Sequence, residues 1–350
     1  MFVFRAQTRE NAAVNLQLPD FAPLRVSVVG DIIADHYLVT QPRSLSREAP
    51  VMVLRYKSED FQAGGAANVA RNVRALGAAT RLHGCVGRDV RGRELIELLE
   101  GFRIDTMGVE SIPEWTTPTK TRIVAAEPRR SLQQVLRVDR EPARPAAAEI
   151  RAKIRERVVS LAQSIDVLLV SDYDYGMVDA ELGRLAAELA ARGVVVVLDP
   201  RSHITGFECV TAMTPNVGEL ARFTGRELDD LADLKDIAQA AGELLARCPM
   251  RWLLVTRGNK GMALFGEGCP ERGIAVDASG SGDVTDVTGA GDTAAAVFAL
   301  ALAAKLDAPT AMQVANAASG VVVMEHGASV CSPDQLRDAL LVTPAPVRIA

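Results

Sequence analysis

The chain has 350 residues, 48% of them apolar and 24% charged, and a formal net charge of -5. This length and composition predict one large globular domain, and the acidic balance, without a long basic run, excludes a nucleic-acid partner held by charge alone. The five cysteines form no C-x-x-C pair, so we expect reduced thiols in a cytoplasmic protein without a zinc site. We expect neither a signal peptide nor a membrane span, because the apolar stretches are too short.

The chain opens with residues 1–24, which show no hydrophobic period and are predicted to be a tail, followed by a single α/β domain over residues 25–345. Short β-branched runs predict buried strands at residues 25–29, 167–170, 194–198 and 253–255. Helical patterns lie between or beside them at residues 146–163, 180–191 and 234–247. Strands that alternate with helices indicate a parallel sheet covered on both faces, with binding residues at the carboxyl ends of the strands.

Two longer strand-like stretches, residues 51–63 and 117–139, carry charges and interrupt this alternation. They predict a small antiparallel sheet that projects from the main domain as a lid, over approximately residues 38–62 and 115–140. Such strands would leave open edges on a monomer, so we expect a homodimer that pairs through them. The proline- and alanine-rich residues 141–148 are predicted to be a loop that leads into a helix.

A glycine-rich start to a helix follows the first of these stretches, at residues 63–77. Gly64 and Gly65 open a helix whose apolar residues recur at intervals of three and four. Bare backbone at such a start lets a ligand approach, and Asn68, one turn in, can hydrogen-bond a hydroxyl. The alternative is a tight turn that serves helix packing only.

A second glycine-rich motif lies near the C-terminus, where residues 286–293 read Asp-Val-Thr-Gly-Ala-Gly-Asp-Thr before an alanine-rich run at 294–304 that predicts a helix. Two glycines around one alanine allow a tight turn with inward N–H groups, and the helix N-terminus adds the positive end of its dipole. The motif therefore predicts an anion site with the carboxylate of Asp292 inside it. The alternative is an ordinary loop in which Asp292 is the helix N-cap.

Together and in this order, the two motifs resemble the signatures of the ribokinase-like, PfkB-type carbohydrate kinases, over roughly residues 25–335. Within that family the chain is most similar to heptose 7-phosphate kinases of lipopolysaccharide-core synthesis. The segments that carry this similarity are Val29-Gly30-Asp31 with Asp35, residues 46–51, residues 119–122, Gln133-Gln134 with Arg137 and Asp139, Ser171-Asp172-Tyr173, and Thr214-Pro215-Asn216. The fold implied is α/β: a ribokinase-like three-layer α/β/α sandwich with a mostly parallel central sheet and a small projecting β-sheet lid.

The resemblance implies roles for the residues of the C-terminal motif. Asp292 resembles the catalytic base, and Gly289, Ala290 and Gly291 resemble the anion hole for the transferring phosphate. Phosphoryl transfer has a loose transition state, so positioning and charge stabilisation matter more than base strength. We expect the helix N-terminus to keep Asp292 ionised as a weak base. Asp286 is implied as a ligand of a monovalent cation, K⁺ in the simplest case.

The same resemblance implies a site for ATP and Mg²⁺. Asn216 and Glu219 match the family's N-x-x-E element, which organises Mg²⁺, through water in the case of Glu219. The alternative is a capping box at a helix start, and both interpretations can hold at once. The other nucleotide-binding positions implied are Thr256, Gly258 and Gly261 beside the phosphates, and Asn316, Gly327 and Ala328 around the adenine.

The sugar site is expected at the carboxylates that follow the first strand, with Asp35 as a direct ligand and Asp31 as a structural residue. The other sugar-binding positions implied are Gly64, Gly65, Asn68, Lys120, Arg122, Gln134, Arg137 and Asp172. A phosphorylated sugar on an acidic chain needs fixed cations, and the candidates in or beside the lid strands are Arg43, Lys120, Arg122, Arg129 and Arg137. The alternative for any one of these cations is the solvated face of an exposed sheet.

The predicted reaction is ATP-dependent phosphorylation of the anomeric hydroxyl of a heptose 7-phosphate to the 1,7-bisphosphate, for ADP-heptose and lipopolysaccharide core synthesis. The alternatives are a family kinase acting on a hexose, pentose or nucleoside, and a catalytically silent sugar-binding relative. The chain has neither G-x-x-x-x-G-K-[ST] nor G-x-G-x-x-G after its first strand, which argues against a P-loop kinase and a Rossmann dehydrogenase.

Two departures from the heptose kinase pattern bear on the substrate and the product. Residues 174–176 read Asp-Tyr-Gly, where such kinases usually carry Lys-Gly. Many of them are also fused to a nucleotidyltransferase with an H-x-G-H motif, which this sequence lacks. We therefore expect the kinase alone, with a separate enzyme activating its product.

Overall fold

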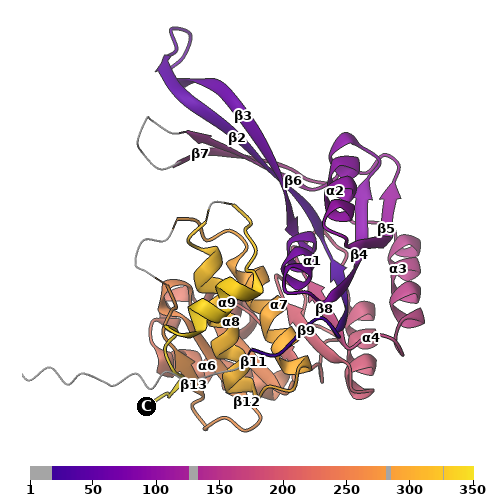
Figure 1. Cartoon of the computed structure of the whole chain (residues 1–350), viewed down its shortest axis with the longest axis vertical. Helices are drawn as coiled ribbons and strands as arrows, with labels where there is room; N and C mark the ends of the chain where they lie inside the picture. The colour runs from indigo at the N-terminus through magenta and orange to yellow at the C-terminus, as the bar shows by residue number, and fades with distance from the viewer. Residues whose placement is uncertain (1–17, 126–132, 281–284, 326) are drawn as a thin grey trace, which may run out of the picture.

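The computed structural model describes residues 18–125, 133–280, 285–325 and 327–350. Within them, a ten-stranded sheet runs through the main body in the order β14-β13-β12-β11-β10-β9-β8-β1-β4-β5 (Figure 1). All neighbours from β5 to β11 are parallel, and the last three strands add antiparallel pairs at one edge. The strands are β1 (Arg25–Gly30), β4 (Ala79–Gly87), β5 (Asp105–Ile112), β8 (Val167–Ser171), β9 (Val195–Asp199), β10 (Ala212–Met213), β11 (Trp252–Thr256), β12 (Met262–Gly266), β13 (Ile274–Val276) and β14 (Val347–Arg348).

Helices cover both faces of this sheet. Aspartates begin several of them: the carboxylates of Asp89, Asp179 and Asp233 accept hydrogen bonds from N–H groups of the first turn, which would otherwise lack partners. The helices are α1 (Ala66–Ala75), α2 (Val90–Gly101), α3 (Ala148–Ser160), α4 (Ala180–Ala191), α5 (Val217–Thr224), α6 (Leu234–Arg247), α7 (Ala290–Ala303), α8 (Ala308–Val322) and α9 (Pro333–Leu340), with short 3-10 turns η1 (Leu228–Leu231) and η2 (Gly258–Lys260). Helices α4 and α6 have the predicted bounds.

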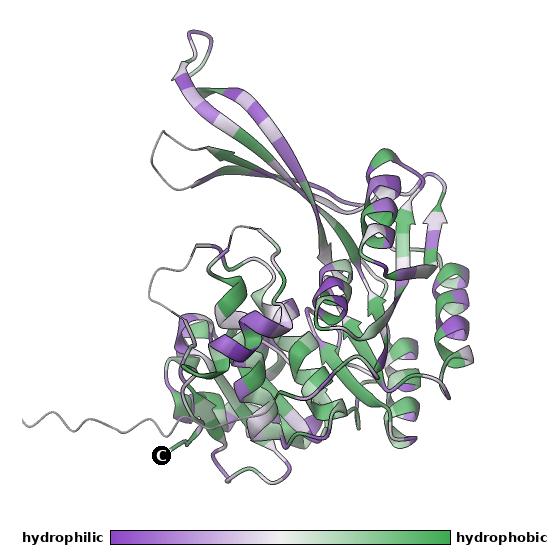
Figure 2. Cartoon of the chain, viewed as in Figure 1, coloured by the Kyte–Doolittle hydropathy of each residue, from purple (hydrophilic) through white to green (hydrophobic). Residues whose placement is uncertain are grey.

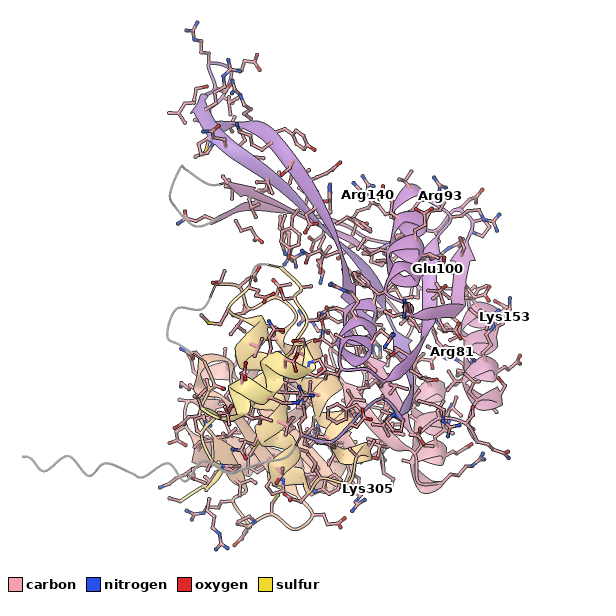
Figure 3. The ribbon with its side chains drawn as sticks, in the orientation of Figure 1. Arg81, Arg93, Glu100, Arg140, Lys153 and Lys305 are labelled. Atoms are coloured by element: carbon pink, nitrogen blue, oxygen red, sulfur yellow. The ribbon has the colours of Figure 1, made fainter. Side chains whose placement is uncertain are left out.

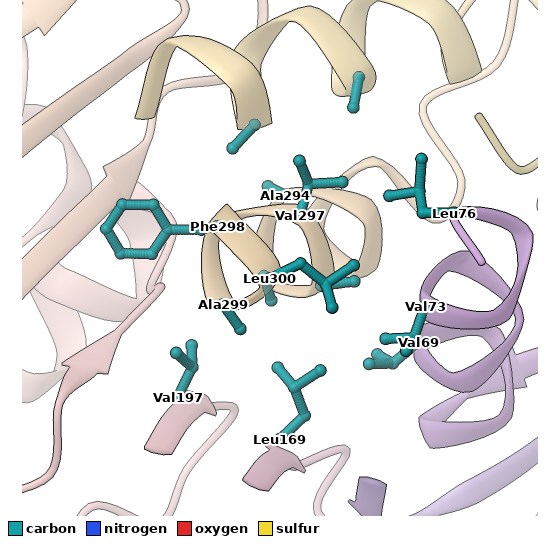
Figure 4. Close-up of a cluster of buried hydrophobic side chains, with 14 of the residues drawn as sticks. Val69, Val73, Leu76, Leu169, Val197, Ala294, Val297, Phe298, Ala299 and Leu300 are labelled. Carbon is teal, nitrogen blue, oxygen red and sulfur yellow. The ribbon is translucent and has the colours of Figure 1, made fainter. Parts of the chain in front are cut away.

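Successive side chains along a strand point to opposite faces of the main sheet, and each face has its own apolar core. In β8, Leu169 joins the core beneath α1, α7 and α8, whereas Leu168 and Val170 join the core beneath α3 to α6. Figure 4 shows Leu169 and Val197 facing α7 from the sheet, with Val73 of α1 beside them. The helix faces turned toward the sheet are accordingly hydrophobic (Figure 2). This arrangement is the three-layer sandwich predicted from the sequence.

Helix α7 begins four residues earlier than its alanine-rich run predicts. Gly289 is the N-cap, with φ of 80°, and Asp292 lies in the first turn of the helix, not before it. The left-handed conformation suits glycine, and a Cβ at position 289 would meet Nδ2 of Asn68 at 2.6 Å. The glycine therefore allows the close approach of α1 to the start of α7.

A second, four-stranded sheet projects from the body above the C-terminal half (Figure 1). Its strands are β3 (Met52–Gly65), β2 (Ile32–Leu45), β6 (Thr119–Ala125) and β7 (Gln133–Arg140), in that order. The prediction of an antiparallel sheet is wrong for the central pair, because β2 and β6 are parallel. Strand β2 follows β1, and β6 follows β5, so both begin at the carboxyl edge of the main sheet. They therefore run in the same direction.

The main body and the projecting sheet both expose charged and apolar side chains. Charged side chains such as Glu100, Lys153 and Lys305 lie at the periphery of the main body (Figure 3). Apolar side chains are exposed on the projecting sheet, at Leu45, Met52, Tyr56, Leu136 and Val138. No helix among the described residues is long and apolar enough to cross a membrane.

Candidate active site

The carboxylate of Asp292 lies at the junction of three elements and is 3% exposed. Its Oδ2 accepts a hydrogen bond from Nδ2 of Asn68 in α1 at 2.7 Å, and its Oδ1 accepts one from the hydroxyl of Tyr173, after β8, at 2.9 Å. Asn72 and Thr293 extend this network, since the Thr293 hydroxyl donates to Oδ1 of Asn72 at 2.9 Å. The predicted residues Asn68 and Asp292 are thus in direct contact, although 224 positions separate them.

Burial raises the pKa of Asp292 to about 6, against the hydrogen bonds from Asn68 and Tyr173 and the charge of Lys120, which lower it. The expectation of a weak base held ionised by the helix N-terminus is therefore incomplete, because desolvation outweighs the stabilisation of the charge. A carboxylate with this pKa is still ionised at neutral pH and accepts a proton more readily than an ordinary aspartate.

The backbone before Asp292 is open to a ligand. Gly291 is exposed, and no heavy atom lies within 4 Å of the position that a Cβ would take there. Packing therefore does not require a glycine at this position. Bare backbone beside the N-terminus of α7 is suited to a phosphate group that approaches the Asp292 carboxylate.

Asp31 positions the loop that carries Tyr173. Its buried carboxylate accepts hydrogen bonds from the backbone N–H groups of Tyr173 at 2.8 Å, Tyr175 at 3.2 Å and Met177 at 3.0 Å. Burial raises the pKa of Asp31 to about 6 despite these donors. A structural role for Asp31 matches this geometry.

Asp35 and Arg122 form one buried ion pair between β2 and β6, with Nη1 of Arg122 donating to Oδ1 of Asp35. Gly64 makes room for this pair, because a Cβ there would meet Oδ2 of Asp35 at 2.5 Å. We predicted separate roles, with Arg122 on a phosphate and Asp35 on hydroxyls. The structure corrects this division: much of the Arg122 charge is neutralised by Asp35, so the two residues act as a unit.

A cavity of about 430 Å³, the Lys120 cavity, lies between β6, β7 and the loop after β8. At one side the ammonium of Lys120 lies 4.9 Å from the ring centre of Tyr173, whose hydroxyl reaches Asp292. Burial lowers the pKa of Lys120, and its ammonium has no ion pair within the described residues. The lining is rich in charged and tyrosine side chains: Lys120, Arg137, Asp139, Glu141, Arg144, Tyr173, Asp174, Tyr175 and Arg201.

A smaller cavity of about 260 Å³, the Arg122 cavity, is lined by Arg122, Gln134, Gln62, Asp286 and Gly327, among others. It lies between the projecting sheet and the loops that flank α7 and follow α8. The predicted sugar-binding residues are therefore divided: Lys120 and Arg137 line one cavity, and Arg122 and Gln134 the other.

Asp286, predicted as a cation ligand, has a carboxylate that accepts hydrogen bonds from two backbone N–H groups. Its Oδ1 accepts from the N–H of Thr288 at 2.9 Å and its Oδ2 from that of Gly327 at 3.0 Å. Burial pushes its pKa upward, but hydrogen bonds from Thr288 and Gly327 and the charge of Arg122 bring the pKa below its usual value. Asp286 is thus an ionised carboxylate with lone pairs left for a cation.

Asp172, predicted to bind the sugar, has another role. Its fully buried carboxylate accepts hydrogen bonds from the backbone N–H groups of Asp174, Arg201, Ser202 and His203. These donors engage both oxygens, so Asp172 joins the loops after β8 and β9. Sequence spacing did not reveal this, because the donors come from a loop about thirty residues away.

Asn216 and Glu219 form the capping box at the start of α5. Oε2 of Glu219 accepts from the N–H of Asn216 at 2.9 Å, and Oδ1 of Asn216 accepts from the N–H of Glu219 at 2.9 Å. The other oxygen of Glu219 lies 3.4 Å from Nη1 of Arg201. Burial raises the pKa of Glu219 against these hydrogen bonds.

A further carboxylate, Asp199, lies at the end of β9. Burial, followed by the charges of Asp292 and Glu219, raises its pKa well above the usual range. No group of three or more His, Cys, Asp or Glu side chains among the described residues is placed to hold a metal ion directly. The donor chemistry nonetheless suits Mg²⁺ bound through water, because nearby carboxylates that disfavour each other's charge are stabilised by a divalent cation.

The predicted nucleotide residues lie at the ends of β11, α8 and the following loop. The N–H of Thr256 donates to Pro215 O at 2.9 Å, which places it beside Asn216. Gly258 and Gly261 flank the turn η2, both with positive φ. Nδ2 of the buried Asn316 donates to Asp277 O at 2.9 Å, and Ala328 N–H donates to Gln62 of β3 at 2.7 Å.

Three other predicted positions fall outside this geometry. Residues 46–51 form the exposed tip of the hairpin β2–β3, far from α7 (Figure 1). Arg43 is exposed on the same hairpin. Arg129 lies outside the described residues.

Four residues near the site were missed as site residues from sequence: Tyr173, Asp199, Arg144 and Arg201. Tyr173 and Asp199 lie at the carboxyl ends of the predicted strands β8 and β9, which was the available signal. Arg201, two residues after β9, carries the same signal, whereas Arg144 comes from a loop with none, and only the fold brings it to Lys120.

The chain was compared with protein families and known structures. Residues 24–335 match the model of the "pfkB family carbohydrate kinase". The chain is 36% identical over 313 residues to the "Bifunctional protein HldE" of Geobacter metallireducens, which covers 88% of this chain and 61% of that one. The chain thus spans less than two thirds of the length of such curated relatives.

Solved structures share the fold at lower identity. Arabidopsis thaliana ribokinase, complexed with ribose and ATP, superposes with a TM-score of 0.69 at 22% identity over 91% of this chain and 98% of that one. Escherichia coli phosphofructokinase-2, in complex with substrates and products, gives 0.73 at 19% identity with the same coverage. The ribokinase-like fold predicted from the sequence is confirmed.

Proposed function

The chain belongs to the pfkB family of carbohydrate kinases and is an ATP-using sugar kinase, and from that premise we propose that it phosphorylates the anomeric hydroxyl of a heptose 7-phosphate. The product would be the 1,7-bisphosphate, a precursor of ADP-heptose for the lipopolysaccharide core. The similarity to proteins named HldE supports this substrate, together with the motifs shared with heptose 7-phosphate kinases.

The observation that carries the proposal is the Lys120 cavity beside Asp292. A sugar whose reacting hydroxyl lies at Asp292 would extend past Tyr173 into a space lined by Lys120 and Arg144, which form no ion pair among the described residues, and by Arg137 and Arg201, which pair with Asp139 and Glu219. Neutral sugars and nucleosides have no group that needs such cations, whereas a phosphate monoester does. Arg144 and Arg201 supply charge where Tyr175 stands in place of the lysine of related heptose kinases.

In the proposed reaction, Asp292 accepts the proton of the sugar hydroxyl as its oxygen attacks the γ-phosphorus of ATP. The P–O bond to ADP breaks as the new one forms, and the N–H groups at the start of α7 stabilise the charge on the transferring phosphoryl group. Asn68 and Tyr173 hold the carboxylate in place, and burial makes it a stronger base. The raised pKa of Tyr173, caused by burial and by Asp292, keeps its hydroxyl protonated as a donor.

We propose that Mg²⁺ is held through water by Glu219 and Asp199, where it would neutralise the phosphates of ATP. Thr256, Gly258 and Gly261 would contact the phosphates, and Asn316 and Gly327 the adenine side. Asp286 is proposed for a monovalent cation such as K⁺, since hydrogen bonds from Thr288 and Gly327 lower the pKa of its carboxyl group.

A coupled ATPase screen tests the substrate. We expect turnover with the heptose 7-phosphate to exceed that with fructose phosphates, ribose and adenosine under saturating ATP and Mg²⁺. A preference for ribose, fructose phosphate or adenosine would favour the alternative, another pfkB-family kinase. No sugar-dependent turnover at all would favour a silent sugar-binding relative.

We also propose a homodimer that pairs through the projecting sheets. The sheet has exposed apolar residues and two edge strands, β3 and β7, and such edges are normally covered. Light scattering should give twice the monomer mass, and Leu136→Asp should shift the protein toward monomer, whereas the same change at the exposed Leu341, outside the sheet, should not. A monomeric wild type at working concentration would contradict the dimer.

A further inference from the structure

A cavity on the far side of the main sheet from α7 is not used by the proposed reaction. This Arg257 pocket, of about 440 Å³, is lined by Val217 of α5, Leu228 and Leu231 of η1, Leu234 and Ile237 of α6, and by Ala232, Asp233, Arg257 and Lys260. Leu231 and Ile237 belong to the core beneath α3 to α6, as do Leu253 and Val255 of β11, whereas Leu254 belongs to the other core. Strand alternation therefore directs Thr256 toward α7 and α8, and Arg257 toward α5 and α6.

The pocket combines apolar walls with two cations, Arg257 and Lys260, and with a buried nitrogen that has no acceptor. Nη1 of Arg257 is buried and has no hydrogen-bond partner, and neither Arg257 nor Lys260 forms an ion pair among the residues that the structure describes. The ammonium of Lys260 reaches only the carbonyl of Ala232, at 3.5 Å. Asp233 also lines the pocket, where its Oδ1 caps α6 by accepting from Lys235 and Asp236 N–H groups, and it forms no ion pair with either cation among the described residues.

A buried guanidinium nitrogen without an acceptor, such as Nη1 of the partly exposed Arg257, is costly unless a ligand supplies the acceptor. The same pocket is lined by the apolar side chains of Leu228, Leu231 and Ile237, of which Leu228 is 58% exposed. A purely ionic ligand such as inorganic phosphate would satisfy the cations but leave these apolar side chains in water. A neutral apolar ligand would cover the apolar side chains but leave the cations without an acceptor.

We propose that the Arg257 pocket binds a small amphipathic organic anion, with an apolar ring or short chain against Leu228, Leu231 and Ile237 and a phosphate or carboxylate on Arg257 and Lys260. The pocket adjoins the nucleotide side of the protein through sequence neighbours: Val217 follows Asn216, and Arg257 follows Thr256. A ligand in the Arg257 pocket would therefore contact the elements that carry the proposed ATP-binding residues Asn216 and Thr256. It would lie on the opposite face of these elements and would not occupy the ATP site.

Isothermal titration calorimetry with 1-naphthyl phosphate, 1-naphthoate and 1-naphthol tests the site, in the presence of a saturating non-hydrolysable ATP analogue. We expect the two anions to bind and the naphthol to bind at least about ten-fold more weakly, the order expected for loss of a charge-assisted hydrogen bond. Arg257→Met should weaken the anions by a similar factor, and Lys260→Gln and Leu228→Ser each by several-fold. Lys235→Gln, an equally exposed lysine change beside the pocket but outside its lining, should leave binding unchanged.

Three results would overturn the proposal: equal binding of naphthol and the anions, displacement of the anions by the ATP analogue, or loss of binding in Arg144→Gln and not in Arg257→Met. The last would place the anions in the Lys120 cavity. If Arg257→Met does not fold, as thermal unfolding would reveal, Lys260→Gln and Leu228→Ser carry the same test, because both residues are exposed. The outcome does not depend on which sugar the kinase phosphorylates.

Discussion

Two groups of charges lie on either side of Tyr173, and the protein holds them in opposite ways. On one side the Asp292 carboxylate is buried, and each of its oxygens accepts a hydrogen bond from a buried or half-buried donor. On the other side Lys120 and Arg144 line an open cavity, with no ion pair among the residues described. The comparison indicates that the Asp292 carboxylate is fixed by contacts within the chain, whereas Lys120 and Arg144 keep capacity for a partner such as the proposed sugar phosphate.

The largest effect should come from removing the fixed carboxylate. Asp292→Asn should lower kcat by roughly two to four orders of magnitude, the usual range for general-base catalysis, while ATP binding is retained. Rate measurements and ATP titration check this, with Asp334→Asn on the surface of α9 as the matched control. Near-normal turnover in Asp292→Asn would remove the base from the proposed mechanism.

Substitutions in the Lys120 cavity should change the preference between substrates more than the rate of phosphoryl transfer. Arg144→Gln and Arg137→Gln should each raise KM for the phosphorylated heptose about ten-fold or more, because a charge-assisted contact contributes roughly 1.5–3 kcal/mol. Slow turnover of an unphosphorylated analogue should barely change, whereas Asp35→Ala should impair both substrates. Arg140→Gln, an exposed change in the same strand outside the cavity, is the control. Equal losses on both substrates in the arginine variants would contradict the heptose 7-phosphate assignment.

Tyr173 joins the two regions, and its hydroxyl should set the pH dependence. Its hydrogen bond lowers the pKa of Asp292, which burial has raised to about 6. Tyr173→Phe should therefore raise that pKa further and move the acid limb of the kcat–pH profile to higher pH, since the base acts only when ionised. The loss of rate should be larger near pH 6 than near pH 8. An unshifted acid limb would mean that another group titrates.

The smallest effect concerns Glu219. Glutamine can also serve in a capping box, so Glu219→Gln removes the charge and leaves the cap available. If Glu219 holds Mg²⁺ through water, the Mg²⁺ concentration for half-maximal rate should rise with little change in thermal stability. Asn216→Ala, by contrast, should cost about 1 kcal/mol of stability through the lost cap. An unchanged Mg²⁺ curve with lowered stability in Glu219→Gln would leave only the capping role.

The fold, and Asp292 as a candidate catalytic carboxylate, could be predicted from the sequence because their signals are local. The strand and helix runs, and the glycine motif before Asp292, each occupy fewer than about twenty consecutive residues, and periodicity reads such segments well. The pairing of Asp35 with Arg122 could not be predicted in the same way, because 87 positions separate them and either residue alone suits a sugar.

The role of Asp172 could not be predicted from sequence patterns either. An aspartate at the carboxyl end of a buried strand suits ligand binding and loop anchoring equally well. The anchoring role is indicated by four backbone N–H groups that donate to Asp172 from neighbouring loops. The positions of these loops follow from packing and not from any pattern in the sequence. The parallel pairing of β2 with β6 depends likewise on where the chain leaves the main sheet.

The continuity of β3 with α1 has a mechanical consequence. Gly65 is both the last residue of the strand and the N-cap of the helix, so no loop intervenes between the projecting sheet and Asn68. A tilt of that sheet would therefore act on α1 and on the hydrogen bond between Asn68 and Asp292, and Gln62, bonded to Ala328, would couple it to the loop after α8. We expect any such tilt to change the rate of ATP hydrolysis without sugar.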